Sequence, residues 1–215
     1  MKRLFDPDSA FIHLLSELAD LVVLNLLWLL CCLPVITIGA STAALYRCTL
    51  NMVYGKGSRR AGAFFAAFRE NFRQATLLWL LLLAVLALLL ADAWLCWQGL
   101  IPYAFSYLVG PGLVIWAFGS AYVFPLCAQF ENSLGGTLKN ALIFSFSHPI
   151  RSLGMVALNL LPGILWYLSP IAFYPLIPCW ILFAVAVTAY VNCLLLRNLF
   201  VPYLASPTPD NPGSE

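Results

Sequence analysis

Charged residues are scarce in this chain. They make up only 9% of its 215 residues, whereas soluble domains contain about 25%. Hydrophobic residues reach 62%, which leaves too few polar side chains to cover a water-soluble core. The formal net charge of +2 is also too small to indicate a nucleic-acid partner. The composition therefore indicates a membrane protein with no nucleic-acid partner.

Catalytic and metal-binding motifs are lacking as well. The sequence contains no GxSxG, HExxH or Walker motif. Its seven cysteines form no CxxC pair, and they lie in or beside apolar segments, where cysteine packs as a small hydrophobic side chain. The two histidines, His13 and His148, lie far apart in the sequence. We therefore expect no catalytic residue, no metal, no cofactor and no enzymatic activity.

Long apolar runs dominate what the sequence does contain. The clearest lies within residues 75–97 and has no charged residue before Asp92. Because a helix rises about 1.5 Å per residue, this run is long enough to cross a hydrocarbon core about 30 Å thick. We expect residues 1–204 to form a single polytopic membrane domain and residues 205–215 to form a disordered tail. Spans are predicted at about 19–38, 75–97, 108–130, 152–169 and 177–196, with 40–54 as a further candidate.

The predicted fold is therefore an all-α membrane bundle of five or six transmembrane helices. The number depends on residues 40–54, a short segment that carries Arg47. Residues 55–74 hold five of the eleven Lys and Arg residues, and the loops at 98–107 and 170–177 hold none. Because basic loops stay on the cytoplasmic side, the C-terminus is expected in the cytoplasm. Six spans would also place the N-terminus inside, whereas five would place it outside.

Three amphipathic stretches precede apolar runs, at 10–18, 63–72 and 138–146. Helices with one apolar stripe and a polar opposite face lie in the membrane interface, so we expect three cytoplasmic interfacial amphipathic helices. The recurrence of this pattern favours six spans over five. The second stretch holds an aromatic stripe beside cations, which predicts a docking surface for lipid or for a partner protein. Its residues are Phe64, Phe68, Arg69 and Arg73, with Phe65 and Phe72 in the same stripe.

Polar residues inside apolar runs are the best sequence signal for a site in a membrane protein. Arg47, Asn25 and Asp92 form the candidate intramembrane polar site. Each also has a structural interpretation. Arg47 is placed to bind lipid phosphate, Asn25 to hydrogen-bond a neighbouring helix, and Asp92 to lie in the wet interface.

The N-terminal half resembles the YesL family of uncharacterised bacterial membrane proteins. The resemblance covers residues 4–92 and lies in FIHLLSELADLVVLNLLWLLCCLPVITIGASTAALY followed by AFFAAFRENFRQATLLW. It implies a bacterial inner-membrane location. It also implies a role near carbohydrate uptake, because genes of this type often lie beside genes for sugar import and polysaccharide breakdown. It supplies no substrate and no catalytic residues.

The leading functional hypothesis is a non-enzymatic accessory or regulatory membrane component associated with carbohydrate uptake. It would contact an ABC-type sugar permease or a membrane sensor through the basic region at 55–74. The alternative is a small transporter that works on its own as a homo-oligomer, with Arg47, Asn25 and Asp92 on the path. The lipid bilayer is the expected partner in both cases.

Overall fold

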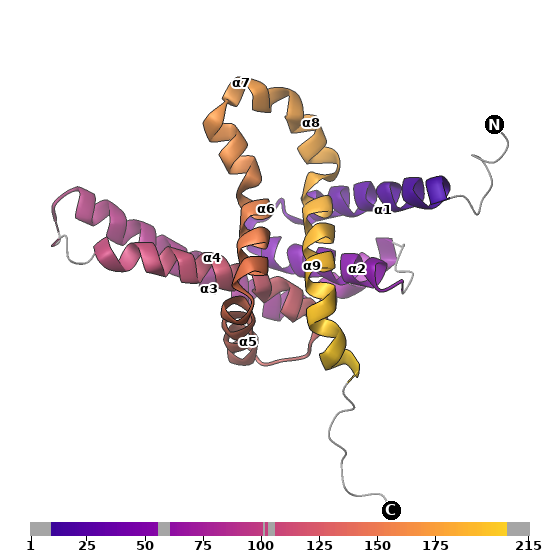
Figure 1. Ribbon diagram of the computed structural model, residues 1–215, viewed down its shortest axis with the longest axis horizontal. Helices are drawn as coiled ribbons and strands as arrows, with labels where there is room; N and C mark the ends of the chain where they lie inside the picture. The colour runs from indigo at the N-terminus through magenta and orange to yellow at the C-terminus, as the bar shows by residue number, and fades with distance from the viewer. Residues whose placement is uncertain (1–9, 56–60, 101, 103–105, 206–215) are drawn as a thin grey trace, which may run out of the picture.

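A computed structural model describes residues 10–55, 61–100, 102 and 106–205 of the chain. The elements described within these ranges are helical (Figure 1). The tail was predicted at 205–215; Ala205 is the last residue of α9, and residues 206–215 lie outside the described residues, as do Lys56, Arg59 and Arg60. The long helices are α1 (Ala10–Cys31), α2 (Ile38–Val53), α3 (Ala61–Trp97), α4 (Ser106–Gln129), α5 (Leu134–Ser147), α6 (Pro149–Leu168) and α9 (Val185–Ala205). The short ones are η2 (Val35–Thr37), α7 (Pro170–Phe173), η4 (Tyr174–Leu176), α8 (Ile177–Cys179) and the π-helix η5 (Trp180–Ala184).

The first apolar run is divided at Pro34. Helix α1 ends at Cys31 rather than at residue 38, and the chain turns before α2 begins. Proline disfavours a helical conformation in the residue before it, so the helix cannot continue through this point. The Thr37 hydroxyl holds the turn by donating to the carbonyl oxygens of Cys31 at 2.6 Å and Pro34 at 2.7 Å.

Helix α2 is the centre of the fold. Most of its residues are buried, and it packs against α1, α3, α4 and α9. Its approach to α3 requires a glycine: a Cβ atom at Gly39 would meet the Ala75 carbonyl oxygen and lie 2.5 Å from the Trp79 Cβ. The small residues at the start of α2 therefore serve close helix packing, as small residues do at helix interfaces in membranes.

Helix α3 is one continuous element of 37 residues. It joins the basic stretch, which we expected as a separate interfacial helix, to the apolar span that follows. Gly99, at a φ of 72°, ends the helix, since this left-handed conformation costs glycine nothing. The Leu100 amide then donates to the Leu95 carbonyl at 3.1 Å, which is the bond of a Schellman motif.

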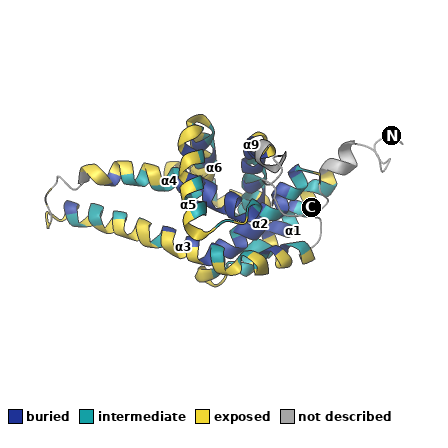
Figure 2. Ribbon diagram, turned by 90° about the horizontal axis from the view of Figure 1, so that it is seen from below, coloured by how far each residue is buried: buried dark blue, intermediate teal, exposed yellow. Residues whose placement is uncertain are grey.

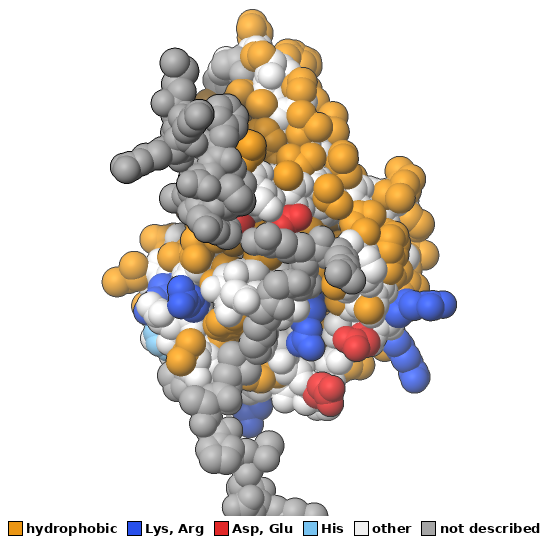
Figure 3. All heavy atoms as spheres, turned by 90° about the vertical axis from the view of Figure 1, so that its right-hand side faces the viewer, with side chains coloured by type: hydrophobic (Ala, Val, Ile, Leu, Met, Phe, Trp, Pro, Cys, Tyr) orange, Lys and Arg blue, Asp and Glu red, His pale blue; other side chains and the backbone are white. Residues whose placement is uncertain are grey.

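Two helical hairpins project from the centre in different directions: α3 with α4, and α6 with α9 through the short helices between them (Figure 1). Most residues in the outer parts of these hairpins are exposed, whereas buried residues gather around α2 (Figure 2). On the face shown in Figure 3, charged side chains lie in the middle and lower part and hydrophobic ones cover the upper part. This is the distribution expected when residues 152–196 of the α6–α9 hairpin, which include no charged side chain, lie in lipid.

Within the described residues, four helical stretches are long and apolar enough to cross a membrane, which indicates a multi-pass membrane protein. They are Ala61–Trp97, Tyr107–Gln129, Pro149–Leu168 and Tyr174–Val201. The all-helical membrane class predicted from the sequence is thereby confirmed. The finer expectations, a bundle of five or six spans and interfacial helices, stay predictions.

Candidate functional site

The docking surface predicted on α3 is divided between two faces of the helix. Phe64 is fully buried in the core, so its assignment to a docking surface is wrong. Phe68 is half-buried and packs against the same core. Helical geometry places both rings on this side, because residues four apart share a face and Phe64 lies on the face toward α2.

The opposite face of α3 is open to the surroundings. Arg69 and Arg73 are exposed, and Phe65 and Phe72 are 43% and 42% exposed. These four residues follow the spacing i, i+4, i+7, i+8, which places them on one stripe of the helix. We call this stripe the cationic face. The cationic face includes Arg69 and Arg73, which were in the predicted docking set. Phe65 and Phe72 take the place of the predicted Phe64 and Phe68.

Arg47 lies at the end of α4. Its Nη1 donates to the Ala128 carbonyl oxygen at 2.6 Å, one residue before α4 ends at Gln129. The last carbonyls of a helix have no partner within it and carry the negative end of the helix dipole. Arg47 therefore caps α4, which gives this side chain a structural role.

Arg47 also lines a polar cavity at this end of the molecule, with a volume of about 510 Å³. Glu70 and Glu131 contribute carboxylates, and Gln74 lies beside them. The Gln74 Nε2 donates to the Asn132 carbonyl oxygen at 2.8 Å and to the Thr137 hydroxyl at 3.1 Å. These bonds tie α3 to the segment between α4 and α5.

Asn25 is fully buried and holds α1 against the last helix. Its Nδ2 donates to the Ile181 carbonyl oxygen at 2.8 Å, and its Oδ1 accepts from the Ala186 amide at 2.8 Å. Both partners lie at the π-helix η5, whose wider turn displaces backbone groups from their usual bonds. Asn25 satisfies these groups, and so it acts in helix packing.

Asp92 is half-buried near the outer end of α3. Neither Asp92 nor Asn25 lines the polar cavity that contains Arg47. The structure thus does not bring the three residues of the predicted intramembrane site together.

A second cavity, which the sequence analysis did not anticipate, lies among α1, α2, α3, α4, α6 and α9. We call it the aromatic cavity, and its volume is about 410 Å³. Three of the seven tryptophans line it, Trp28, Trp79 and Trp116. Each comes from a different helix, and hydropathy patterns carry no information about which tryptophans converge. The other lining residues are Thr42, Leu45, Tyr46, Leu82, Ser120, Ala121, Phe124, Asn159, Val185, Thr188 and Ala189.

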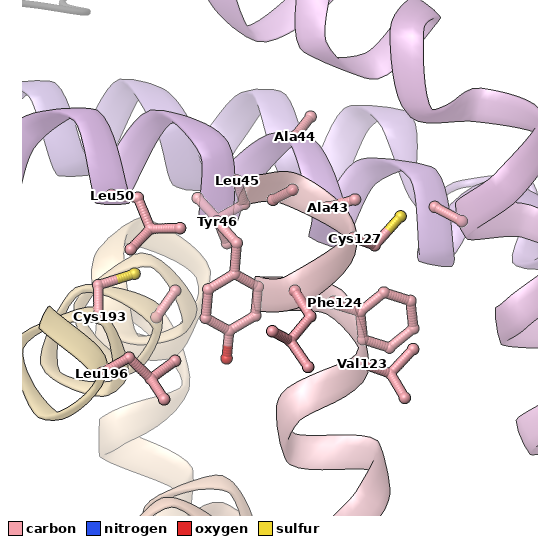
Figure 4. Packing of buried hydrophobic residues seen from close by; sticks show 14 of the residues in the cluster. Ala43, Ala44, Leu45, Tyr46, Leu50, Val123, Phe124, Cys127, Cys193 and Leu196 are labelled. Carbon is pink, nitrogen blue, oxygen red and sulfur yellow. The ribbon is translucent and has the colours of Figure 1, made fainter. Parts of the chain in front are cut away.

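Tyr46 connects this cavity to a buried polar group. Its ring points away from α2 between Cys193 and Leu196 on one side and Phe124 on the other (Figure 4). The Tyr46 hydroxyl accepts a hydrogen bond of 3.1 Å from the Asn192 amide, which also donates to the Asn159 Oδ1 at 3.2 Å. Three helices thus share one hydrogen-bonded group beside the cavity.

Metal chemistry finds no support in the described part of the chain. No group of three or more His, Cys, Asp or Glu side chains there is arranged to hold a metal ion. None of the seven cysteines, all of which lie in the described ranges, forms a disulfide.

The fold and its charge distribution define a multi-pass helical membrane protein without a recognisable catalytic centre among the described residues. Residues 21–93 match the family described as "Protein of unknown function, DUF624". The chain is also 29% identical over 151 residues to the "Uncharacterized protein YesL" of Bacillus subtilis (strain 168), covering 67% of this chain and 71% of that relative. No solved structure gives a significant match. The resemblance to the YesL family is thus confirmed as a similarity over these residues.

Proposed function

We propose that this protein is a non-enzymatic accessory or regulatory component of carbohydrate uptake in the bacterial inner membrane. It docks to an ABC-type sugar permease or a membrane sensor. The observation that carries the proposal is the exposed cationic face on the N-terminal part of α3. The link to carbohydrate comes from the YesL resemblance and the kind of genes that accompany this family.

The length of α3 favours a protein partner over lipid for this face. Its 37 residues extend for about 56 Å, whereas the hydrocarbon core is about 30 Å thick. If residues 75–97 cross the core, residues 61–74 continue along the same axis for about 21 Å beyond it. A segment that continues out of the membrane presents its side chains to the aqueous phase. An interfacial helix would instead lie flat in the headgroups.

The chemistry of the face suits an acidic partner surface. Arg69 and Arg73 carry exposed guanidinium groups that bind carboxylates through paired hydrogen bonds. Phe65 and Phe72 flank them with exposed rings. Arginine combined with aromatic side chains is the composition enriched at the energetic centres of protein interfaces.

The same proposal includes the topology. Helix α1 has 22 residues, about 33 Å, which is enough for a fifth span. Helix α2, with 16 residues and a buried surface, is the candidate for a sixth. With the basic α3 segment and Arg197 on the same side, the C-terminus lies in the cytoplasm.

A charge-reversal experiment tests the docking surface. The variant Arg69→Glu with Arg73→Glu is expressed in a bacterial host that carries the sugar permease, solubilised in mild detergent and purified by affinity. We expect the permease or sensor to co-purify with the wild type and to be reduced at least tenfold with the variant. The matched control is Lys139→Glu with Arg197→Glu, which changes the charge equally at two other exposed cations.

Equal reduction by both double variants would reject the cationic face as the docking surface. So would unchanged co-purification in a stably inserted Arg69→Glu, Arg73→Glu variant. Recovery of the protein alone, as a defined oligomer, would reject the accessory role itself.

A second function, that of a small transporter working as a homo-oligomer, is favoured by one arrangement. The polar cavity and the aromatic cavity are both lined by α2, α3 and α4, at different levels of these helices. Two cavities along one set of helices are the elements of a path through the membrane. Purified protein in liposomes tests this function: accumulation of a labelled sugar against empty liposomes would support it, and equal counts would reject it.

A further inference from the structure

The aromatic cavity has the features of a binding site for a small neutral solute. Its volume of about 410 Å³ falls in the range of small-molecule sites, roughly 300–1,000 Å³. Among the described residues that line it, none carries a charge. Anionic and cationic ligands would lose their hydration there without gaining a counter-charge.

The three tryptophan rings are fixed in position. Trp28 donates its indole hydrogen to the Thr42 hydroxyl at 3.2 Å, Trp79 to the Val35 carbonyl at 3.0 Å, and Trp116 to the Leu82 carbonyl at 2.8 Å. With the polar edge of each ring occupied, what remains for a ligand is the aromatic face. Because the rings are held before a ligand arrives, little ordering entropy is lost when one binds.

Hydrogen-bonding groups lie among these rings. Ser120 and Thr188 bring hydroxyl groups to the cavity wall, and Asn159 brings a carboxamide. The Ser120 hydroxyl also donates to the Ala117 carbonyl oxygen at 3.0 Å, and the Asn159 Oδ1 accepts from Asn192. A purely hydrocarbon ligand such as an acyl chain would leave their remaining hydrogen-bonding capacity unused. A ligand with both hydroxyl groups and apolar C–H surfaces would satisfy the polar side chains and cover the rings.

The buried polar group next to the cavity has one bonding position left over. Asn192 is fully buried, and its Oδ1 has no hydrogen-bond partner among the described residues. Turning the amide over would exchange oxygen for nitrogen and leave the nitrogen without a partner. Asn192 does not line the cavity itself, but its Nδ2 bonds Tyr46 and Asn159, which do, and these bonds fix the Asn159 side chain in the cavity wall.

We propose that the aromatic cavity binds a neutral saccharide of one or two pyranose rings, stacked on Trp28, Trp79 and Trp116 and hydrogen-bonded by Asn159 and Thr188. A pyranose presents C–H groups on its faces, which pack against aromatic rings, and hydroxyl groups around its edge, which bond amides. The inference deepens the proposed function, on which it rests for its physiological context. The protein would then bind the sugar whose import it serves.

The test uses purified full-length protein in lipid nanodiscs. Glucose, galactose, mannose, rhamnose, maltose and cellobiose are titrated while tryptophan fluorescence and binding heat are recorded. We expect a saturable response to at least one of these sugars. Asn159→Leu and Thr188→Val, each close to the original side chain in size, should weaken that affinity at least tenfold. Trp97→Phe, which alters an 83% exposed ring at the end of α3, should leave it unchanged.

The absence of a saturable response to every sugar in the panel would overturn the proposal. Tighter binding of glucuronate than of glucose would overturn the assignment to a neutral ligand. Nanodiscs made with lipids brominated on the acyl chain add a second arm. The brominated lipids would quench tryptophan fluorescence if lipid fills the cavity. In that case Trp28→Phe and Trp116→Phe would remove the quenching, and added sugar would not relieve it.

Failure here is distinguishable from failure of the proposed function. The binding assay contains no partner protein, and the co-purification assay does not require sugar. If sugar binds but no partner is recovered, the saccharide site stands and the docking role is rejected. If a partner is recovered but no sugar binds, the docking role stands and the saccharide site is rejected.

Discussion

The Oδ1 atom of Asn25 accepts a hydrogen bond from the amide of Ala186, the second residue of α9 after the π-helical turn ends at Ala184. The two residues are 161 positions apart in the sequence, so this contact joins the first helix of the chain to the last. The Asn25 amide therefore satisfies backbone hydrogen-bonding groups of another helix and does not line a solute path.

Replacing Asn25 by Leu should therefore destabilise the fold. The change keeps the size of the side chain but leaves the Ile181 carbonyl and the Ala186 amide without this partner. We expect the free energy of unfolding to fall by about 1–3 kcal/mol, the usual cost of an unsatisfied buried group. Thermal unfolding in detergent, followed by fluorescence-detected size exclusion, measures the effect. Leu26→Ala, at a 45% exposed neighbour, is the control. An unchanged melting temperature in Asn25→Leu would contradict the packing role.

The contact at Gly39 makes a second prediction. Adding one methyl group in Gly39→Ala forces α2 away from Ala75 and Trp79, since the new Cβ would overlap them. Overpacking of this kind costs typically about 1–3 kcal/mol. Gly62→Ala makes the same chemical change where nothing lies within 4 Å of the new Cβ, and alanine favours helix over glycine. We expect a lower melting temperature in the first variant and an equal or higher one in the second. The opposite order would refute the close approach.

The cap that Arg47 places on α4 makes a third prediction. Arg47→Met keeps the aliphatic part of the side chain but removes the bond to the Ala128 carbonyl. The last turn of α4 should then open more often. Hydrogen–deuterium exchange at residues 124–130 should become faster, while exchange at α6 stays the same. Arg47→Lys, which retains a charge near the helix end, should show a smaller change. Unaltered exchange in Arg47→Met would mean that the bond is not required.

The continuity of α3 makes a fourth prediction, on labelling. Cysteines introduced at Phe65 and Phe72 should react with a membrane-impermeant maleimide in inside-out vesicles, because the proposed topology places them in cytoplasmic water. Cysteines at Leu81 and Leu88 are exposed on the protein surface but would face lipid, so they should not react. The parent chain gives the background from its own cysteines. Labelling of all four positions would rule out a lipid-embedded outer half of α3.

Hydropathy and helical periodicity predicted the class of this fold well, because lipid demands long apolar helices whatever the tertiary contacts are. They could not separate Phe64 from Phe65. Both belong to one aromatic stripe, and only the position of α2 decides which ring is buried. The aromatic cavity could not be predicted from the sequence. Trp28, Trp79 and Trp116 are far apart in the sequence, and each alone is an ordinary apolar residue.

The role of Asn25 was within reach of the sequence as a helix-packing amide. What the sequence could not supply was its partner, because the π-helix at residues 180–184 leaves no mark in the pattern of apolar residues. Arg47 is a similar case. Its position suggested a polar site, but the end of α4 that it caps is determined by where the chain leaves that helix.

Helix α3 is a rigid rod that reaches from the cationic face to the far end of the α3–α4 hairpin, and this rigidity has a mechanical consequence. Helix α3 has no proline among its 37 residues, so it has no built-in hinge and turns as one lever. A tilt of roughly 10° about one end would displace the other end by about 10 Å and the middle by about 5 Å. Trp79 lies at the middle of that lever and also in the wall of the aromatic cavity. A partner docked on the cationic face, as proposed, would therefore change the shape of the cavity, and an occupied cavity would resist that movement.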